Sequence, residues 1–260
     1  MIGFVIKKTF FDLWDNMFRL VLVNLGFIAS LAIPVFLPGI IPIPIISIII
    51  FAAGLLWCFV YLAAAALSVK AVSDYGVFGF SDFLANLKEG WKAGLALGIT
   101  GFLLYAITKN AIPFYLRMNS LFGLFLAAVI FWSMATAICS LQFFLAIRAR
   151  LDTKLIKVFK KCFIIFFDNS GFSLYSLLHT AVTLIISLIF ALLLPGPAGL
   201  LLFLDEALRL RLLKYDWLEA NPDTTGSKKK RRIPWDEILI DEREKTGTRS
   251  FRSFIFPWKD

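Results

Sequence analysis

The chain has 260 residues, of which 59% are hydrophobic and 17% are charged, and it contains 28 phenylalanines and 7 tryptophans. Soluble domains have about 45–50% apolar and about 25% charged residues, so this composition excludes water as the main solvent and indicates a bilayer. The net charge of +9 would suggest nucleic acid for a soluble protein, but the lysines and arginines cluster beside apolar stretches, where anionic headgroups attract them. Nucleic-acid binding is therefore not expected.

An amphipathic segment and two apolar spans are expected at the start of the chain. Residues 4–18 are rich in aromatic side chains around two lysines, which is typical of segments at the cytoplasmic surface. Residues 20–69 contain no charged residue and are long enough for two helices across a hydrocarbon core about 30 Å thick. Spans are therefore predicted at residues 20–38 and 44–67. The turn region between them contains Pro34, Pro38, Gly39, Pro42 and Pro44.

Residues 80–91 are expected to form a second interfacial helix. Their apolar residues recur at helical spacing, and polar residues occupy the opposite face. The third span is predicted at residues 92–109, whose short apolar run is extended because Lys92 and Lys109 reach toward the two interfaces.

Three glycines with a four-residue spacing mark the start of this third span. Gly90, Gly94 and Gly98 share one helix face, which predicts the close approach of another helix. Packing within the subunit is favoured over dimerisation, because the spacing is common in membrane helices.

The fourth span is predicted at residues 120–147, and a basic amphipathic segment follows it. Lys154, Lys157 and Lys161 form a basic stripe beside apolar residues that also recur at helical spacing. This pattern predicts an interfacial helix whose lysines bind anionic lipid headgroups.

Two further spans are predicted in the last apolar stretch, which is divided near residue 195 by prolines. The fifth span is placed at residues 172–194 and a shorter sixth at residues 197–214. Five spans are the alternative, because the sixth would carry charged residues into or near the membrane. The positive-inside rule favours six, since five would place the basic tail opposite nearly all the other lysines and arginines. Both termini are therefore expected on the cytoplasmic side.

Four charged residues of the sixth span are the strongest candidates for a functional site: Asp205, Glu206, Arg209 and Arg211. Ionisable groups at membrane depth are costly and usually face a partner or a wet cavity, so this set would suit a gate or an ion site. Asp205 and Arg209 are four residues apart and can pair on one helix face. The alternative is that the helix ends near the inner surface and its charges lie among the headgroups.

Other chemistry-bearing residues give weaker signals. His179 is the only histidine, and spans one to five supply no acidic partner for a proton relay, so a packing role is favoured. Cys58, Cys139 and Cys162 lack metal-ligand spacing and are expected to be small buried apolar residues. No catalytic set, metal site or cofactor motif is recognised, so no enzyme, metal or cofactor is expected.

The composition changes beyond the spans, so the chain is divided into a helical membrane domain at residues 1–218 and a cytoplasmic tail at residues 219–260. The basic-aromatic end of the tail is expected to dock on the membrane interface or on the protein's own cytoplasmic face, and a peptide ligand for a partner protein is the alternative. The tail also contains a polybasic block that is expected to bind lipid headgroups. This block consists of Lys228, Lys229, Lys230, Arg231 and Arg232.

Three segments in this order resemble the YesL-like family of small, uncharacterised bacterial polytopic membrane proteins. They are VNL at 23–25, SVKAVSDYGVFGFSDFLANLKEGWKAG at 68–94 and KLIKVFKKCFIIFFDNSGF at 154–172. The similarity covers about residues 1–218, and the tail from residue 221 departs from the family pattern. The resemblance implies a setting in bacterial carbohydrate uptake, and it assigns no functional residues.

The sequence thus predicts an all-α polytopic transmembrane helical bundle of about six spans, with amphipathic interfacial helices on the cytoplasmic side of the bacterial inner membrane. The favoured function is a non-enzymatic accessory or assembly component, associated with a carbohydrate-uptake system. Its expected partners are the anionic bilayer and either a membrane transporter complex or further copies of itself. The alternative function is a small-solute transporter that uses the charged cluster of the sixth span.

Overall fold

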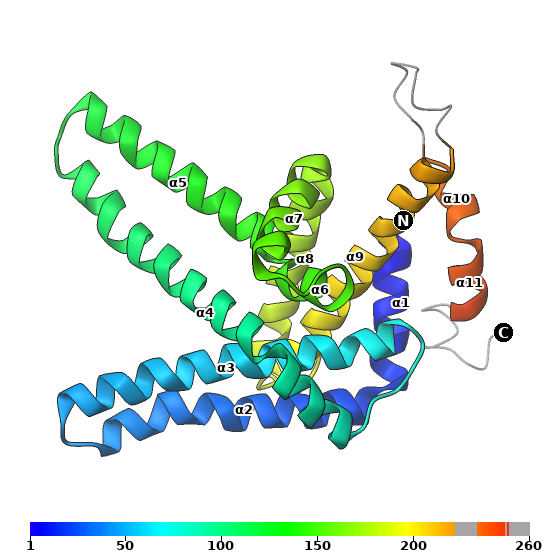
Figure 1. The fold of residues 1–260 in the computed structure, drawn as a ribbon, viewed down its shortest axis with the longest axis horizontal. Coiled ribbons are helices and arrows are strands. Elements are labelled where there is room, and N and C mark those ends of the chain that lie inside the picture. Colours follow the sequence, from blue (N-terminus) through cyan, green and yellow to red (C-terminus); the bar gives the residue numbers. More distant parts are fainter. Residues whose placement is uncertain (222–232, 248, 250–260) are drawn as a thin grey trace.

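The computed structural model describes residues 1–221, 233–247 and 249, which are helical and contain no strand. Figure 1 shows two long helical hairpins that project from a body in which the remaining helices meet. In chain order, the helices are α1 (Ile2–Asp15), α2 (Met17–Ile40), α3 (Pro44–Ser73), α4 (Phe80–Leu116), α5 (Leu121–Leu141), α6 (Phe144–Arg150), α7 (Leu155–Asp168), α8 (Ser170–Ile189), α9 (Gly196–Ala220), α10 (Trp235–Ile238) and α11 (Ile240–Thr246).

Within the described residues, five helical segments are long and apolar enough to cross a membrane. They are α2, α3, α4, the α5–α6 segment Leu121–Arg150 and α8. The predicted class, an all-α polytopic membrane protein, is confirmed. Helix α9 is not among the five, so the sixth span at residues 197–214 stays a prediction.

The first hairpin joins α2 to α3 in the region where two spans were predicted. Pro44 begins α3. Proline is well tolerated there, because the backbone N–H group that it lacks would have no hydrogen-bond partner within the first turn of the helix. Pro34 and Pro38 lie inside α2 rather than in the turn. Farther along the pair, the hydroxyl of Tyr61 donates to the carbonyl oxygen of Val23 at 2.8 Å, which joins the two helices near the body.

Helix α4 is one continuous helix of 37 residues, where an interfacial helix and a separate span were expected. Pro113 is the only proline inside it, so no helix breaker separates the two expected elements. Its first half packs against α3, and its second half extends with α5 as the second hairpin (Figure 1).

The turn between α8 and α9 packs against the first part of α2. The side-chain amide of Asn24 donates to the carbonyl oxygens of Leu193 at 2.8 Å and Pro195 at 3.0 Å. Asn24 lies seven residues after Met17, the first residue of α2, which is about 10 Å along the helix axis. The other two hairpin turns follow Ile40 and Leu116, so the α8–α9 turn stops well short of the far end of α2.

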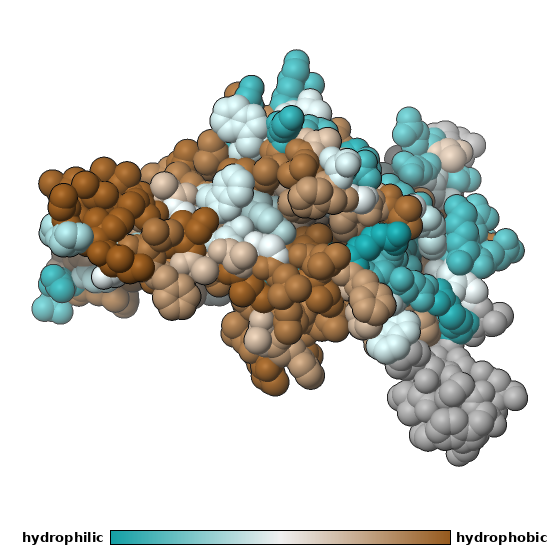
Figure 2. Space-filling view, turned by 90° about the horizontal axis from the view of Figure 1, so that it is seen from below, coloured by the Kyte–Doolittle hydropathy of each residue, from teal (hydrophilic) through white to brown (hydrophobic). Residues whose placement is uncertain are grey.

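The apolar core lies in the body, where α3, α6, α7 and α9 meet. Phe143, Ile147, Val158, Cys162 and Leu208 are almost completely buried there. Figure 2 shows apolar side chains over the projecting α2–α3 hairpin and the middle of the molecule, whereas hydrophilic side chains gather at the end that carries α1, α10 and α11. The polar end and the apolar projections together suit a membrane protein with one hydrated face.

Candidate functional site

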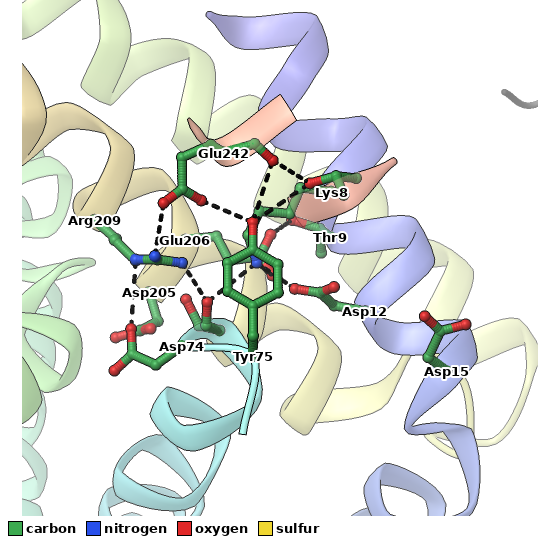
Figure 3. Close-up of polar contacts among 12 residues, drawn as sticks. Lys8, Thr9, Asp12, Asp15, Asp74, Tyr75, Asp205, Glu206, Arg209 and Glu242 are labelled. Atoms are coloured by element: carbon green, nitrogen blue, oxygen red, sulfur yellow. Dashed lines mark hydrogen bonds and ion pairs between the residues drawn. The ribbon is translucent and has the colours of Figure 1, made fainter. Parts of the chain in front are cut away.

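A network of ion pairs, several of them buried, lies where α1, α9 and the C-terminal end of α3 meet in the body (Figure 3). Three of the four charged residues predicted as a site, Asp205, Glu206 and Arg209, belong to it. The ion-pair network consists of Lys8, Thr9, Asp12, Ser73, Asp74, Arg150, Asp205, Glu206, Arg209 and Glu242.

Glu206 and Lys8 form the deepest part of the network. Both side chains are fully buried, and Lys8 Nζ lies 3.3 Å from Glu206 Oε1. Lys8 also pairs with Asp12 and donates to the carbonyl oxygen of Ser73 at 3.1 Å, while Thr9 Oγ1 donates to Glu206 Oε2 at 2.5 Å. Lys8 thus forms ion pairs with two buried carboxyl groups, those of Asp12 and Glu206.

Arg150 holds the second part of the network together. Its guanidinium forms a two-nitrogen contact with the Asp205 carboxylate, an arrangement that adds geometric specificity to the charge attraction. The same guanidinium donates to Asp74 Oδ1 at 2.9 Å and to Ser73 Oγ at 2.9 Å. Arg150 therefore ties the ends of α3 and α6 to the middle of α9.

Arg209 extends the network to the tail. Its guanidinium contacts Asp74 at 3.4 Å and donates to Glu242 Oε1 of α11 at 2.7 Å. The hydroxyl of Tyr75 donates to Glu242 Oε2 at 2.8 Å, and burial raises the pKa of Tyr75, so the phenol keeps its proton. Because Leu239 is completely buried beside these contacts, the segment 233–247 is docked on the body by both polar and apolar groups.

The expected pair between Asp205 and Arg209 is replaced by longer-range pairs. Asp205 binds Arg150 from α6, and Arg209 binds Asp74 and Glu242 from the α3 end and α11. Each partner comes from a different element, so the network fixes how the elements are arranged. Breaking one buried pair typically costs about 3–5 kcal/mol, because the remaining charge is left uncompensated.

Arg211, the fourth predicted residue, lies in a separate contact. Its Nε atom donates to Asn169 Oδ1 at 2.6 Å, and its guanidinium lies 5.1 Å from the ring centre of Phe172. Asn169 also donates to the hydroxyl of Tyr215 at 2.6 Å. These contacts connect the α7–α8 junction to the last turns of α9.

Several members of the network gave no sequence signal of their own. Lys8 and Asp12 are four residues apart in an amphipathic helix, a spacing that also fits an exposed surface pair. Asp74 lies between the second predicted span and the expected interfacial helix at residues 80–91, and Glu242 lies in the predicted tail; neither was predicted as a site residue. Their connection to α9 depends on contacts between positions far apart in the chain, which local patterns do not encode.

The predicted glycine face lies directly against α3. A Cβ atom at Gly94 would lie 2.5 Å from Val60 Cα, and one at Gly90 would lie 3.2 Å from the backbone of Ala63. At Gly98 the neighbours would be Leu56 and Phe59, each at 3.0 Å. The three glycines thus lie at a contact between two helices of the same chain.

The predicted headgroup-binding lysines lie in two places. Lys154, Lys157 and Lys161 are on or next to α7, where the first two are exposed and Lys161 is partly buried. The polybasic block 228–232 lies outside the described residues, as does the aromatic end at residues 250–260.

His179 is part of the packing between α8 and α9. Its ring is stacked on Phe203 with 3.8 Å between ring centres, and its Nδ1 atom lies 3.4 Å from Thr183 Oγ1. Among the described residues, no group of three or more histidine, cysteine, aspartate or glutamate side chains could hold a metal ion.

No protein-family model, curated protein or solved structure matches the chain.

Proposed function

We propose that the protein is a non-enzymatic assembly component of a bacterial inner membrane, which packs its long hairpins against the helices of another membrane protein. The observation that carries the proposal is the exposure of the α4–α5 hairpin. After Gly98, none of the remaining residues of α4 is buried, and the buried residues of α5 are limited to Gly123, Ala127 and Ser140. Two long helices that contact little besides each other leave wide apolar faces for lipid and for partner helices.

The ion-pair network supports a structural rather than a transporting role. Apart from Asp12, which pairs with Lys8 of the same helix, its acidic groups are bonded to basic groups from other elements, so the charges connect the helices. A transport site would instead present charged groups to a substrate or an ion within a pathway. The alternative of a small-solute transporter that uses Asp205, Glu206 and Arg209 is therefore less well supported than assembly.

The proposed partner is a carbohydrate importer, and this choice follows from the resemblance to the YesL-like family. The proposed orientation places both termini in the cytoplasm, because the lysines and arginines of the chain are concentrated in the body and the tail. The hydrated end that carries α1 and α11 would then face the cytoplasm, and the tips of the two long hairpins would lie at the outer surface.

Site-specific photocrosslinking in native membranes tests the assembly function. A photoreactive residue replaces Phe102 in α4 or Phe125 in α5, whose side chains are 66% and 62% exposed. We expect both positions to capture the same membrane protein. A matched probe at Ala64 of α3, which is completely buried, should capture nothing outside the chain. Capture of lipid alone from both exposed positions would contradict the proposal.

A further inference from the structure

Helix α7 has an unevenly charged surface. Its lysines lie in the first half of the helix, at positions 157, 160 and 161, and its second half is apolar as far as Phe167. On the exposed side, Ile156, Lys160, Phe163 and Phe167 follow one another at spacings of three or four residues, so they share one face. After Ile156, this face is basic at Lys160 and apolar at Phe163 and Phe167.

The apolar half of this face borders a groove between α7 and α5. The groove has a volume of about 370 Å³ and is lined by Trp132, Ser133, Thr136, Phe163 and Phe167. Its volume is within the range of about 300–1,000 Å³ that is usual for small-molecule sites. The rims are accessible, because Trp132 is 68% and Phe167 is 69% exposed.

The lysines of α7 differ in whether their ammonium groups already have hydrogen-bond or ion-pair partners. Lys161 Nζ donates to the carbonyl oxygen of Leu151 at 3.2 Å and to Asp152 Oδ2 at 3.3 Å, so it stabilises the start of the helix. Lys157 and Lys160 are exposed and have no hydrogen bond or ion pair among the described residues. Lys160 is one turn from Phe163, so its positive charge lies beside the groove.

We propose that the α5–α7 groove binds one anionic phospholipid, with an acyl chain along Trp132 and Phe163 and the phosphate at Lys157 and Lys160. A lipid is the occupant that matches both halves of the site, because it joins an anionic group to an apolar chain. A free phosphate would leave the apolar groove unused. The inference rests on the membrane location in the proposed function, and it is independent of the protein partner.

The first test is lipid binding to the purified full-length protein, measured by native mass spectrometry. Phosphatidylglycerol and phosphatidylcholine with identical acyl chains are compared at equal concentrations. We expect phosphatidylglycerol to bind at least about tenfold more tightly, because each basic residue contributes about 1 kcal/mol toward an anionic headgroup. Excess inorganic phosphate should not displace it. Equal affinity for the two lipids, or displacement by phosphate, would overturn the proposal.

Charge-matched variants test the position of the headgroup. The double variant Lys157→Gln/Lys160→Gln should lose most of the preference for phosphatidylglycerol. Lys88→Gln/Lys92→Gln removes two exposed positive charges from α4 instead and should keep it. Equal losses in both variants would show a diffuse charge effect and would contradict a discrete site.

A groove-filling variant tests the position of the acyl chain. Thr136→Phe places a ring in the groove and leaves all lysines intact, so it should lower the affinity for phosphatidylglycerol severalfold. Unchanged affinity in a folded variant would place the lipid elsewhere. Photocrosslinking to a protein partner from Phe102 should be unaffected by these variants, which separates failure of the lipid site from failure of the assembly function.

Discussion

Lys8 and Glu206 are 198 positions apart in the chain, yet their side chains form a completely buried ion pair. The pair joins the first helix to the middle of α9. It shows that the N-terminal segment is an integral part of the body and not only a surface element that precedes the first span.

Replacing Lys8 tests how much this pair contributes to stability. Lys8→Met should lower the free energy of unfolding by about 3–5 kcal/mol, because it leaves Glu206 and Asp12 buried without their cation. Lys8→Met/Glu206→Met should recover part of the loss, since an apolar pair of similar volume can replace a buried ion pair. Denaturant unfolding in detergent measures both changes. Lys7→Met is the control, and a loss as large as that of Lys8→Met would refute the assignment.

Removing Glu242 tests the docking of the tail on the body. Glu242→Ala deletes the acceptor for Arg209 and Tyr75, and hydrogen bonds to charged groups contribute about 1.5–3 kcal/mol each. We expect faster hydrogen exchange across residues 233–247. Glu244→Ala removes an exposed carboxylate from the same helix and should leave exchange unchanged. Identical exchange in both variants would mean that apolar contacts alone hold the segment.

Asn24 and Gly196 provide a test of the α8–α9 turn. The Asn24 Oδ1 atom accepts from the Ala198 N–H at 2.8 Å, and Gly196 has a positive φ of 61° and lies directly against the Asn24 side chain. Asn24→Ala should destabilise the protein by about 1–3 kcal/mol, because buried polar groups lose their partners. Gly196→Ala should also destabilise, through a collision and an unfavourable φ. A double-mutant cycle should show coupling, whereas simple additivity would contradict the contact.

The position of the same turn leads to a prediction of topology. Single cysteines in a background that lacks the three native ones are labelled from outside with a membrane-impermeant maleimide. Positions 42 and 118, in the two long hairpin turns, should react, and position 192 should not, because the α8–α9 turn lies only about 10 Å along α2. Helix α8 is thus expected to enter the membrane without crossing it, although its length and composition would allow a crossing, and this differs from the six spans predicted from the sequence. Reaction at position 192 as fast as at position 42 would show that α8 and α9 reach the outer surface.

Asp168 should make the α7–α8 junction sensitive to acid. Burial raises its pKa, but hydrogen bonds from Lys214 at 2.7 Å and from Tyr215 at 2.5 Å outweigh this effect and hold the pKa below its ordinary value of 3.8. A depressed pKa contributes stability above the unfolded-state value, and this contribution is lost as pH falls through the folded-state value. The melting temperature in detergent should therefore fall more steeply below about pH 4 for the wild type than for Asp168→Asn. Parallel curves would contradict this role.

The sequence was most informative about the apolar helices. The charge-free stretch at residues 20–69 predicted two spans because crossing a bilayer imposes a local requirement on length and hydrophobicity. The continuity of α4 was not predicted, since an amphipathic segment followed by an apolar one fits either one helix or two. The partners of Asp205 and Arg209 were missed for a different reason. A spacing of four favours a local pair, but tertiary packing brings Arg150, Asp74 and Glu242 closer.

We propose that the ion-pair network holds the hairpins in a geometry that another membrane protein recognises. The most direct test is the yield of the crosslinked partner from Phe102 in the Lys8→Met/Glu206→Met variant, normalised to its abundance in native membranes. We expect Lys8→Met alone to lower this yield, because it leaves Glu206 buried without its cation, and the double variant to give a yield close to that of the wild type, because an apolar pair can maintain the same helix arrangement. An unchanged yield in Lys8→Met would show that the network does not hold this geometry. Loss of the crosslink in a double variant of normal abundance and stability would contradict the claim and assign the function to the charges themselves.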